Sequence, residues 1–149
     1  MKTLVLALGN PILSDDGVAH EVADLLAKRC GQLDIVKSSA ATMDIINQLA
    51  GYERLVVVDA IQLGSVPPGT LHRFSLDDLA DTVRPSCPHD INFATALGLG
   101  KEWGYDIPED IRIYGIEVKE LLKFSEGCTP EVAESLEEIV EQILSDLAN

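Results

Sequence analysis

Basic residues are scarce in this 149-residue sequence, with 11 Lys and Arg against 25 Asp and Glu and a formal charge of −14. Such a surface repels polyphosphates, and no Lys/Arg cluster offsets the repulsion locally, so a general binder of nucleic acid or anionic membranes is excluded. No apolar run reaches the roughly 20 residues of a membrane span. The run at residues 3–8 is too short for a signal peptide. We therefore expect a soluble, cytoplasmic protein, without a nucleic-acid or membrane partner.

Cysteine is also scarce, occurring only as Cys30, Cys87 and Cys128. An odd number without a Cys-x-x-Cys pair argues against a disulfide framework and against a structural zinc site, so we expect reduced thiols. Cys87 is two residues from His89, but no helix start or basic group is evident that would lower the pKa of its thiol. We assign Cys87 no catalytic role.

Three common catalytic signatures are missing from the sequence. It has no Gly-x-Ser-x-Gly elbow, no Walker loop and no complete Gly-x-Gly-x-x-Gly at the first turn. The sequence therefore contains none of these motifs to indicate a serine hydrolase or a nucleotide-binding protein.

What is present is a regular alternation of short apolar runs and helical periodicities. Strands are predicted at residues 3–8, 33–37, 54–59, 70–74 and 111–116, the fourth of them at a sheet edge. Helices are predicted at residues 17–29, 43–49 and 91–103 and from Pro130, with Thr129 as its N-cap. This order predicts one α/β domain over residues 1–149, with a mostly parallel twisted sheet and helices on both faces in three layers.

In such a sheet, functional side chains are expected at the carboxyl ends of the strands. Asn10, Asp15 and Asp16 follow the first strand, Asp59 ends the third, and His89 is predicted at the same rim. Asp16, Asp59 and His89 would together supply two carboxylates and an imidazole with positions left open for water or substrate, which suits zinc or nickel.

Each of these residues also has an ordinary structural interpretation. A carboxylate before a helix caps its free amides, which applies to Asp16 and more strongly to Asp15. Asp59 has the alternative of a turn-forming aspartate, and His89 that of a histidine exposed to water.

The other two histidines are weaker candidates. His20 lies four residues after Asp16 on the same helix face, where the two residues form a potential metal-binding pair, although a solvated surface histidine is the expected outcome. His72 lies in the predicted edge strand, away from the rim, and receives no role.

The combination of motifs resembles the hydrogenase maturation proteases over essentially the whole chain. The motifs are Leu-Ala-Leu-Gly-Asn-Pro at 6–11, Asp-Asp-Gly at 15–17, Val-Val-Asp-Ala at 57–60 and Pro-His-Asp at 88–90. The late strand at 113–117 and the start of the last helix extend the resemblance.

The resemblance implies an enzyme that removes a C-terminal extension from the large-subunit precursor of a NiFe hydrogenase after nickel insertion. It implies that Asp16, Asp59 and His89 bind the nickel carried by that precursor, with zinc or another divalent ion possible at the same site. The metal would then polarise the scissile peptide or a bound water, or would serve only for recognition while a carboxylate activates water. We expect a monomer.

Two departures from the family pattern affect the substrate subtype. Asp16 stands where many relatives have glutamate, and residues 38–42 lack the Asp-Gly-Gly-Thr-like motif of many proteases that process uptake hydrogenases. A cytoplasmic, cofactor-reducing hydrogenase is the expected target.

Two alternative functions remain open at this point. A receiver domain would use Asp59 as phosphate acceptor and Lys119 as its late lysine. In receiver domains, however, the acidic pair directly ends the first strand, whereas here it lies beyond the strand at positions 15 and 16, and His89 would have no function. A nonenzymatic, nickel-dependent binding module for the same subunit would lack turnover.

Overall fold

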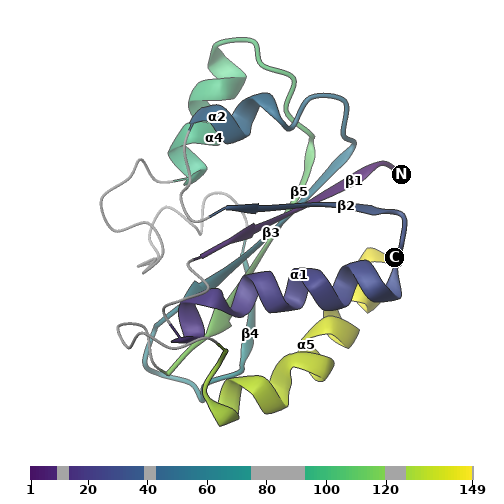
Figure 1. Ribbon diagram of the computed structural model, residues 1–149. Helices are drawn as coiled ribbons and strands as arrows, with labels where there is room; N and C mark the ends of the chain where they lie inside the picture. Colours follow the sequence, from purple (N-terminus) through teal and green to yellow (C-terminus); the bar gives the residue numbers. More distant parts are fainter. Residues whose placement is uncertain (10–13, 39–42, 75–92, 120–126, 149) are drawn as a thin grey trace.

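A five-stranded sheet forms the centre of the computed structural model, which describes residues 1–9, 14–38, 43–74, 93–119 and 127–148 (Figure 1). The strands are β1 (Thr3–Leu8), β2 (Leu33–Ser38), β3 (Arg54–Ile61), β4 (Leu71–Phe74) and β5 (Asp110–Glu117). Their order is β2-β1-β3-β5-β4. All neighbours pair in parallel except β4, which is antiparallel to β5.

Helices cover both faces of this sheet. They are η1 (Ser14–Gly17, a 3₁₀ turn), α1 (Val18–Arg29), α2 (Met43–Asn47), α4 (Phe93–Glu102) and α5 (Pro130–Leu147). Figure 1 shows α1 and α5 on one face and α2 and α4 on the other, in agreement with the two apolar cores. The predicted three-layer α/β fold is confirmed. No helix in the described ranges is both long and apolar enough to cross a membrane.

Alternation along β3 explains why all eight residues of this strand are buried. Val56 and Val58 contribute to the core under α1 and α5, whereas Leu55 and Val57 contribute to the core under α2 and α4. Successive side chains of a strand point to opposite faces, so a strand covered on both faces is apolar throughout. This is the pattern from which the central strand was predicted.

Pairing with β5 makes β3 longer than predicted. The sequence interpretation ended the strand at Asp59, but Ala60 pairs with Ile116 and Ile61 pairs with Glu117. Asp59 therefore lies within the strand, two residues before its end. The predicted helix at 91–103 is observed as α4, with residues 91–92 outside the described part of the chain.

The antiparallel β4 occupies the edge of the sheet, as predicted. Its presence also distinguishes this sheet from that of a receiver domain, whose strand order is 2-1-3-4-5. The receiver interpretation of Asp59 is therefore set aside.

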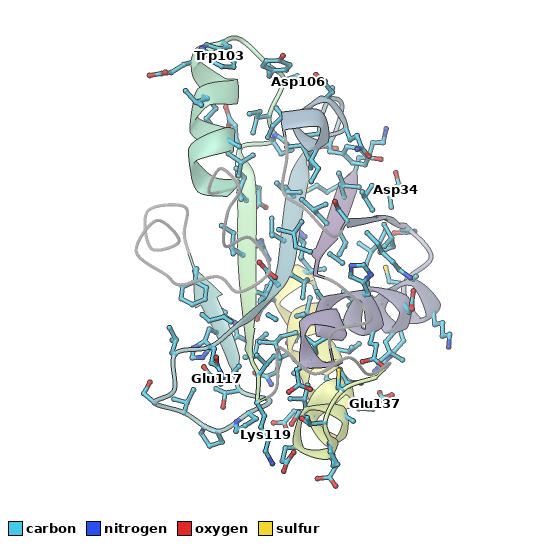
Figure 2. All side chains as sticks on the ribbon, turned by 60° about the vertical axis from the view of Figure 1, so that its left-hand side comes forward. Asp34, Trp103, Asp106, Glu117, Lys119 and Glu137 are labelled. Carbon is cyan, nitrogen blue, oxygen red and sulfur yellow. The ribbon has the colours of Figure 1, made fainter. Side chains whose placement is uncertain are left out.

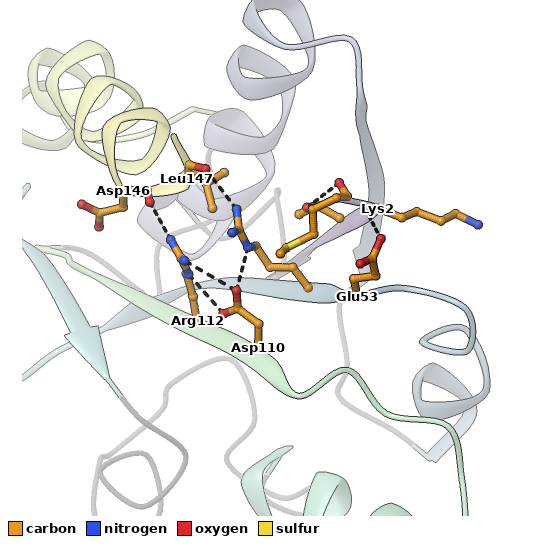
Figure 3. Close-up of polar contacts among 9 residues, drawn as sticks. Lys2, Glu53, Asp110, Arg112, Asp146 and Leu147 are labelled. Carbon is orange, nitrogen blue, oxygen red and sulfur yellow. Dashed lines mark hydrogen bonds and ion pairs between the residues drawn. The ribbon is translucent and has the colours of Figure 1, made fainter. Parts of the chain in front are cut away.

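The last helix is fixed at the amino edge of the sheet by two arginines (Figure 3). Arg112 Nη1 donates to the carbonyl of Asp146 at 2.6 Å, and Arg54 Nη1 donates to the carbonyl of Leu147 at 3.1 Å. Both guanidinium groups also bind Asp110. Cations stabilise the free carbonyls at the end of a helix, so this network orients α5 along the sheet. At its other end, Thr129 is the N-cap, as predicted.

Candidate functional site at the carboxyl edge of the sheet

The candidate site lies at the topological switch point of the sheet, where the strand order reverses. From β1 the chain passes through α1 to β2 on one side, whereas β3 pairs with β1 on the other side. Open α/β sheets bind ligands at the carboxyl ends of the two strands that flank such a switch point. The turn η1, which contains Asp16, packs against β3. The structure thus brings the turn of Asp16 to the strand of Asp59, as the sequence predicted.

The three predicted ligands are described to different degrees. Asp59 is fully described, whereas for Asp16 only the backbone of its turn is described. His89, Asn10 and Cys87 lie outside the described residues. The assignment of Asp16, Asp59 and His89 to one metal site therefore stays a prediction.

Asp59 is a buried carboxylate inside the central strand. Its side chain is 2% exposed, and its Oδ1 accepts the backbone N–H of Ala60 at 2.8 Å. By alternation it faces the same side as Val57, toward the α2 and α4 layer. A buried carboxylate needs polar partners to offset the cost of its burial, and the position of Asp59 at the carboxyl half of β3 makes it a candidate for a functional residue.

Asp15 connects the β1–α1 turn to a distant part of the chain. Its carboxylate is fully buried and accepts the backbone N–H of Lys119 at 2.8 Å. It also accepts the backbone N–H of Thr129 at 2.6 Å and the Thr129 hydroxyl at 3.0 Å. The N-cap position of α1 is occupied by Gly17 and not by Asp15, contrary to the sequence interpretation.

Glu117 is a third buried carboxylate at this edge, which the sequence interpretation did not single out. It ends β5, is 2% exposed, and accepts the backbone N–H groups of Leu63 and Gly64 at 3.1 Å each. His72 Nε2 lies 3.2 Å from its Oε1. The available signal was an acidic residue directly after an apolar strand, the same signal that identified Asp59.

The position of His72 corrects the prediction that it lies away from the rim. Because β4 is antiparallel to β5, its first residues lie beside the carboxyl end of β5, and His72 pairs with Gly115. Gly115 in turn pairs with Asp59. His72 and Asp59 therefore occupy one row across three strands, with a glycine between them.

The buried charges are separated between the two edges of the sheet. Among the described residues, the buried carboxylates are Asp15, Asp59 and Glu117, all at the carboxyl edge, whereas buried Arg54 begins β3 at the opposite edge. Figure 2 shows Glu117 and Lys119 near the start of α5, far from Trp103 and Asp106. Such an arrangement produces a negative potential at the carboxyl edge and favours a cation there.

A complete metal site cannot be assembled from the described residues. Within them, no group of three His, Cys, Asp or Glu side chains is placed to hold a metal ion. The side chain of Asp16 and the whole of His89 lie outside the described part of the structure. Asp59 supplies one carboxylate of suitable chemistry at this edge.

Two other polar groups near α1 have structural partners. His20 is half-buried, with Nε2 3.4 Å from the carbonyl oxygen of Ser38, so it is not the fully solvated histidine that was expected. The Cys128 thiol donates to Glu21 Oε2 at 2.6 Å. Burial, together with the nearby Glu21 carboxylate, raises the pKa of Cys128 well above its usual range. Cys30 and Cys128 are free thiols, as predicted.

A hollow of about 560 Å³ lies elsewhere on the molecule. It is lined by Arg73, Phe74, residues 111–114 and Asp146. These residues belong to the end of β4, the first half of β5 and the end of α5, toward the amino edge of the sheet, whereas η1 lies at the carboxyl edge. None of the described residues that line this hollow is a predicted metal ligand.

Comparisons with known proteins agree with this fold. The chain is similar to the family model described as hydrogenase maturation protease (HycI) over residues 18–146. It is 26% identical over 151 residues to Hydrogenase 2 maturation protease of Escherichia coli K12, covering 99% of this chain and 91% of the relative. The structure of the NiFe hydrogenase maturation protease HybD from Thermococcus kodakarensis superposes with a TM-score of 0.78 at 26% identity, over 100% of both chains. The structure of the Escherichia coli endopeptidase HybD has a TM-score of 0.81 at 24% identity, over 99% of this chain and 93% of that one, and shares the fold.

Proposed function

Because this chain belongs to the hydrogenase maturation protease family, we propose that it is an endopeptidase that removes the C-terminal extension of a NiFe hydrogenase large-subunit precursor. The observation that carries this proposal is the buried carboxylate of Asp59 at the switch point of the sheet, beside the turn that contains Asp16. The similar proteins named above act in hydrogenase maturation. The negative carboxyl edge is suited to a substrate that carries a cation.

We propose that Asp16, Asp59 and His89 bind the nickel of the unprocessed precursor. Carboxylate and imidazole groups are suitable ligands for a divalent transition metal. The backbone N–H of Ala60 donates to Oδ1 of Asp59 and so orients this carboxylate at the carboxyl edge of the sheet. The nickel is part of the substrate in this proposal, and its presence reports that the large subunit has been loaded.

Two routes to peptide hydrolysis are compatible with these residues. In the first, the nickel polarises the scissile carbonyl or lowers the pKa of a water molecule. In the second, the nickel serves for recognition, and a carboxylate of this chain takes a proton from the attacking water. In both, this edge of the sheet holds the precursor so that its scissile peptide lies beside Asp59.

The proposed activity is tested by turnover. A nickel-loaded precursor is incubated with substoichiometric protein, and the intact mass of the precursor is followed over time. We expect a discrete C-terminal peptide to be lost from far more precursor molecules than there are protein molecules. A stable one-to-one complex with an uncut precursor would instead support the nonenzymatic binding module and overturn the protease proposal.

A further inference from the structure

The Asp15 carboxylate joins three segments that are distant in sequence. Its acceptor oxygens are bound by Lys119, which follows β5, and by Thr129, which caps α5. These partners are 104 and 114 residues from Asp15 along the chain. The carboxylate therefore connects η1 to the end of a central strand and to the start of the longest helix among the described elements.

The strength of this connection follows from its burial and its donors. Asp15 is fully buried, and its carboxylate accepts the backbone N–H groups of Lys119 and Thr129 at 2.8 and 2.6 Å. These two donors are backbone N–H groups, which cannot turn away as a side chain can. Lys119 lies two residues after β5 and Thr129 directly precedes α5, so the position of the carboxylate is set by segments next to elements of the core.

A second contact links the segment before α5 to the start of α1. Cys128 precedes Thr129 and donates to Glu21 on the first turn of α1. The start of α5 is thus linked to both η1 and α1. A displacement of η1 relative to β3 would break the bonds of Asp15 or move the start of α5 with it.

We infer that Asp15 is a positioning residue for the metal-binding function of Asp16. This inference rests on the proposed role of Asp16. The two residues are neighbours in one four-residue 3₁₀ turn, so the bonds that fix Asp15 also fix the backbone of Asp16. Metal ligands must be held to within about 0.5 Å of their working geometry. Asp15 provides this precision without contacting the metal or the precursor.

The inference is tested with three variants at the connection and one control elsewhere. Asp15→Asn keeps the size of the side chain but replaces one acceptor by an NH₂ group facing N–H donors. Thr129→Val removes the hydroxyl at constant shape, whereas Thr129→Ser keeps it. The control Asp146→Asn removes a carboxylate that accepts hydrogen bonds from Arg73 and Tyr114 at the opposite edge.

Three quantities are measured for each variant under conditions where urea titration shows it to be folded. They are the affinity of the isolated protein for Zn²⁺ and Ni²⁺ by calorimetry, the kcat/KM for a nickel-loaded precursor, and the amide exchange rates of residues 14–17. We expect Asp15→Asn to lose about 10- to 100-fold in metal affinity and in kcat/KM, the range seen when a residue that holds a metal ligand in place is substituted, with faster amide exchange in η1. Thr129→Val should show a smaller loss of the same kind, and Thr129→Ser and Asp146→Asn should match the wild type.

The outcomes separate this inference from the proposed function. If the wild type binds metal or cleaves the precursor and folded Asp15→Asn does so equally well, the inference is overturned and Asp15 serves stability alone. The same conclusion follows if Asp146→Asn lowers metal affinity as much as Asp15→Asn. A wild-type protein that neither binds metal nor cleaves any precursor overturns the proposed function and this inference together.

Discussion

His72 Nε2 lies 3.2 Å from Oε1 of Glu117, and this contact links β4 to β5 at the carboxyl edge of the sheet. The same carboxylate accepts the backbone N–H groups of Leu63 and Gly64, so one buried side chain fixes the loop that follows β3. That loop begins shortly after Asp59. The carboxyl edge is therefore stabilised by buried acids that use backbone donors from neighbouring segments.

Substitution of Glu117 by glutamine is expected to destabilise the fold. The new NH₂ group cannot accept the N–H bonds of Leu63 and Gly64, and a buried donor left without an acceptor costs about 1–3 kcal/mol. The free energy of unfolding, from urea titration, measures this loss. The control is Glu53→Gln, where an exposed carboxylate accepts the Lys2 N–H, with an expected change within about 0.5 kcal/mol. Equal stability of the two variants would contradict the assigned role of Glu117.

Substitution of glycine by alanine is expected to change the stability of the fold in opposite directions at Gly115 and Gly98. A Cβ at Gly115 would lie 2.4 Å from Ile61 Cγ2 and 2.8 Å from Phe74 Cε2, so Gly115→Ala should lose about 1–3 kcal/mol through overpacking. A Cβ at Gly98 in α4 meets no atom of the described residues within 4 Å. Gly98→Ala should gain about 0.5–1 kcal/mol, because glycine is a poor helix residue. Urea titration of both variants compares the signs, and a stabilised Gly115→Ala would show that the edge packs differently.

Acid stability should depend on Asp146. The hydrogen bond from Arg73, assisted by that from Tyr114, holds the pKa of Asp146 below its ordinary value of 3.8, against the opposing effect of burial. Because the unfolded chain binds this proton more readily, the stabilisation is present above pH 3.8 and is lost as the pH falls through the lower pKa of the folded state. Urea titrations at a series of acidic pH values should show a shallower loss for Asp146→Asn than for the wild type. Identical slopes would refute this linkage.

The Cys128 thiol should resist alkylation. Burial and the adjacent Glu21 raise its pKa, so little of the reactive thiolate is present at neutral pH. We expect iodoacetamide to label Cys30 faster than Cys128 in the folded protein, as read by peptide mass mapping. Both should react at similar rates in urea. Faster labelling of Cys128 than of Cys30 in the folded state would show that the Glu21 contact is not maintained.

The fold was predictable from the sequence because local patterns determine most of it. Three consecutive valines at 56–58 identified the central strand, and Thr129-Pro130 identified the start of α5. The extension of β3 beyond Asp59 was not predictable, because it depends on pairing with a strand some fifty residues later. The antiparallel direction of β4 was equally unpredictable, and it changed the location of His72.

The burial of Asp59 at the carboxyl half of β3 agrees with the sequence interpretation, whereas the bonds that hold the neighbouring segments in place were not predictable. Asp59 was identified because a carboxylate follows a buried run, whereas Glu117 gave the same signal and was missed. The role of Asp15 could not be found in this way, since its partners lie more than a hundred residues away and two are backbone groups. Sequence patterns identify side chains that differ from their surroundings, whereas backbone donors leave no mark in the sequence.

We propose above all that Asp59, with Asp16 and His89, recognises the nickel of the precursor. The most direct measurement is the intact mass of nickel-loaded and nickel-free precursor after incubation with wild type, Asp59→Asn, His89→Ala and Asp34→Asn. Asp34 is the matched control, an exposed carboxylate in β2 that accepts the Tyr52 hydroxyl at 2.6 Å. The account predicts loss of a discrete C-terminal peptide only from nickel-loaded precursor, and only with wild type and Asp34→Asn. Cleavage of the nickel-free precursor would contradict this role. Cleavage of the nickel-loaded precursor by folded Asp59→Asn or His89→Ala at the rate of the wild type would contradict it as well.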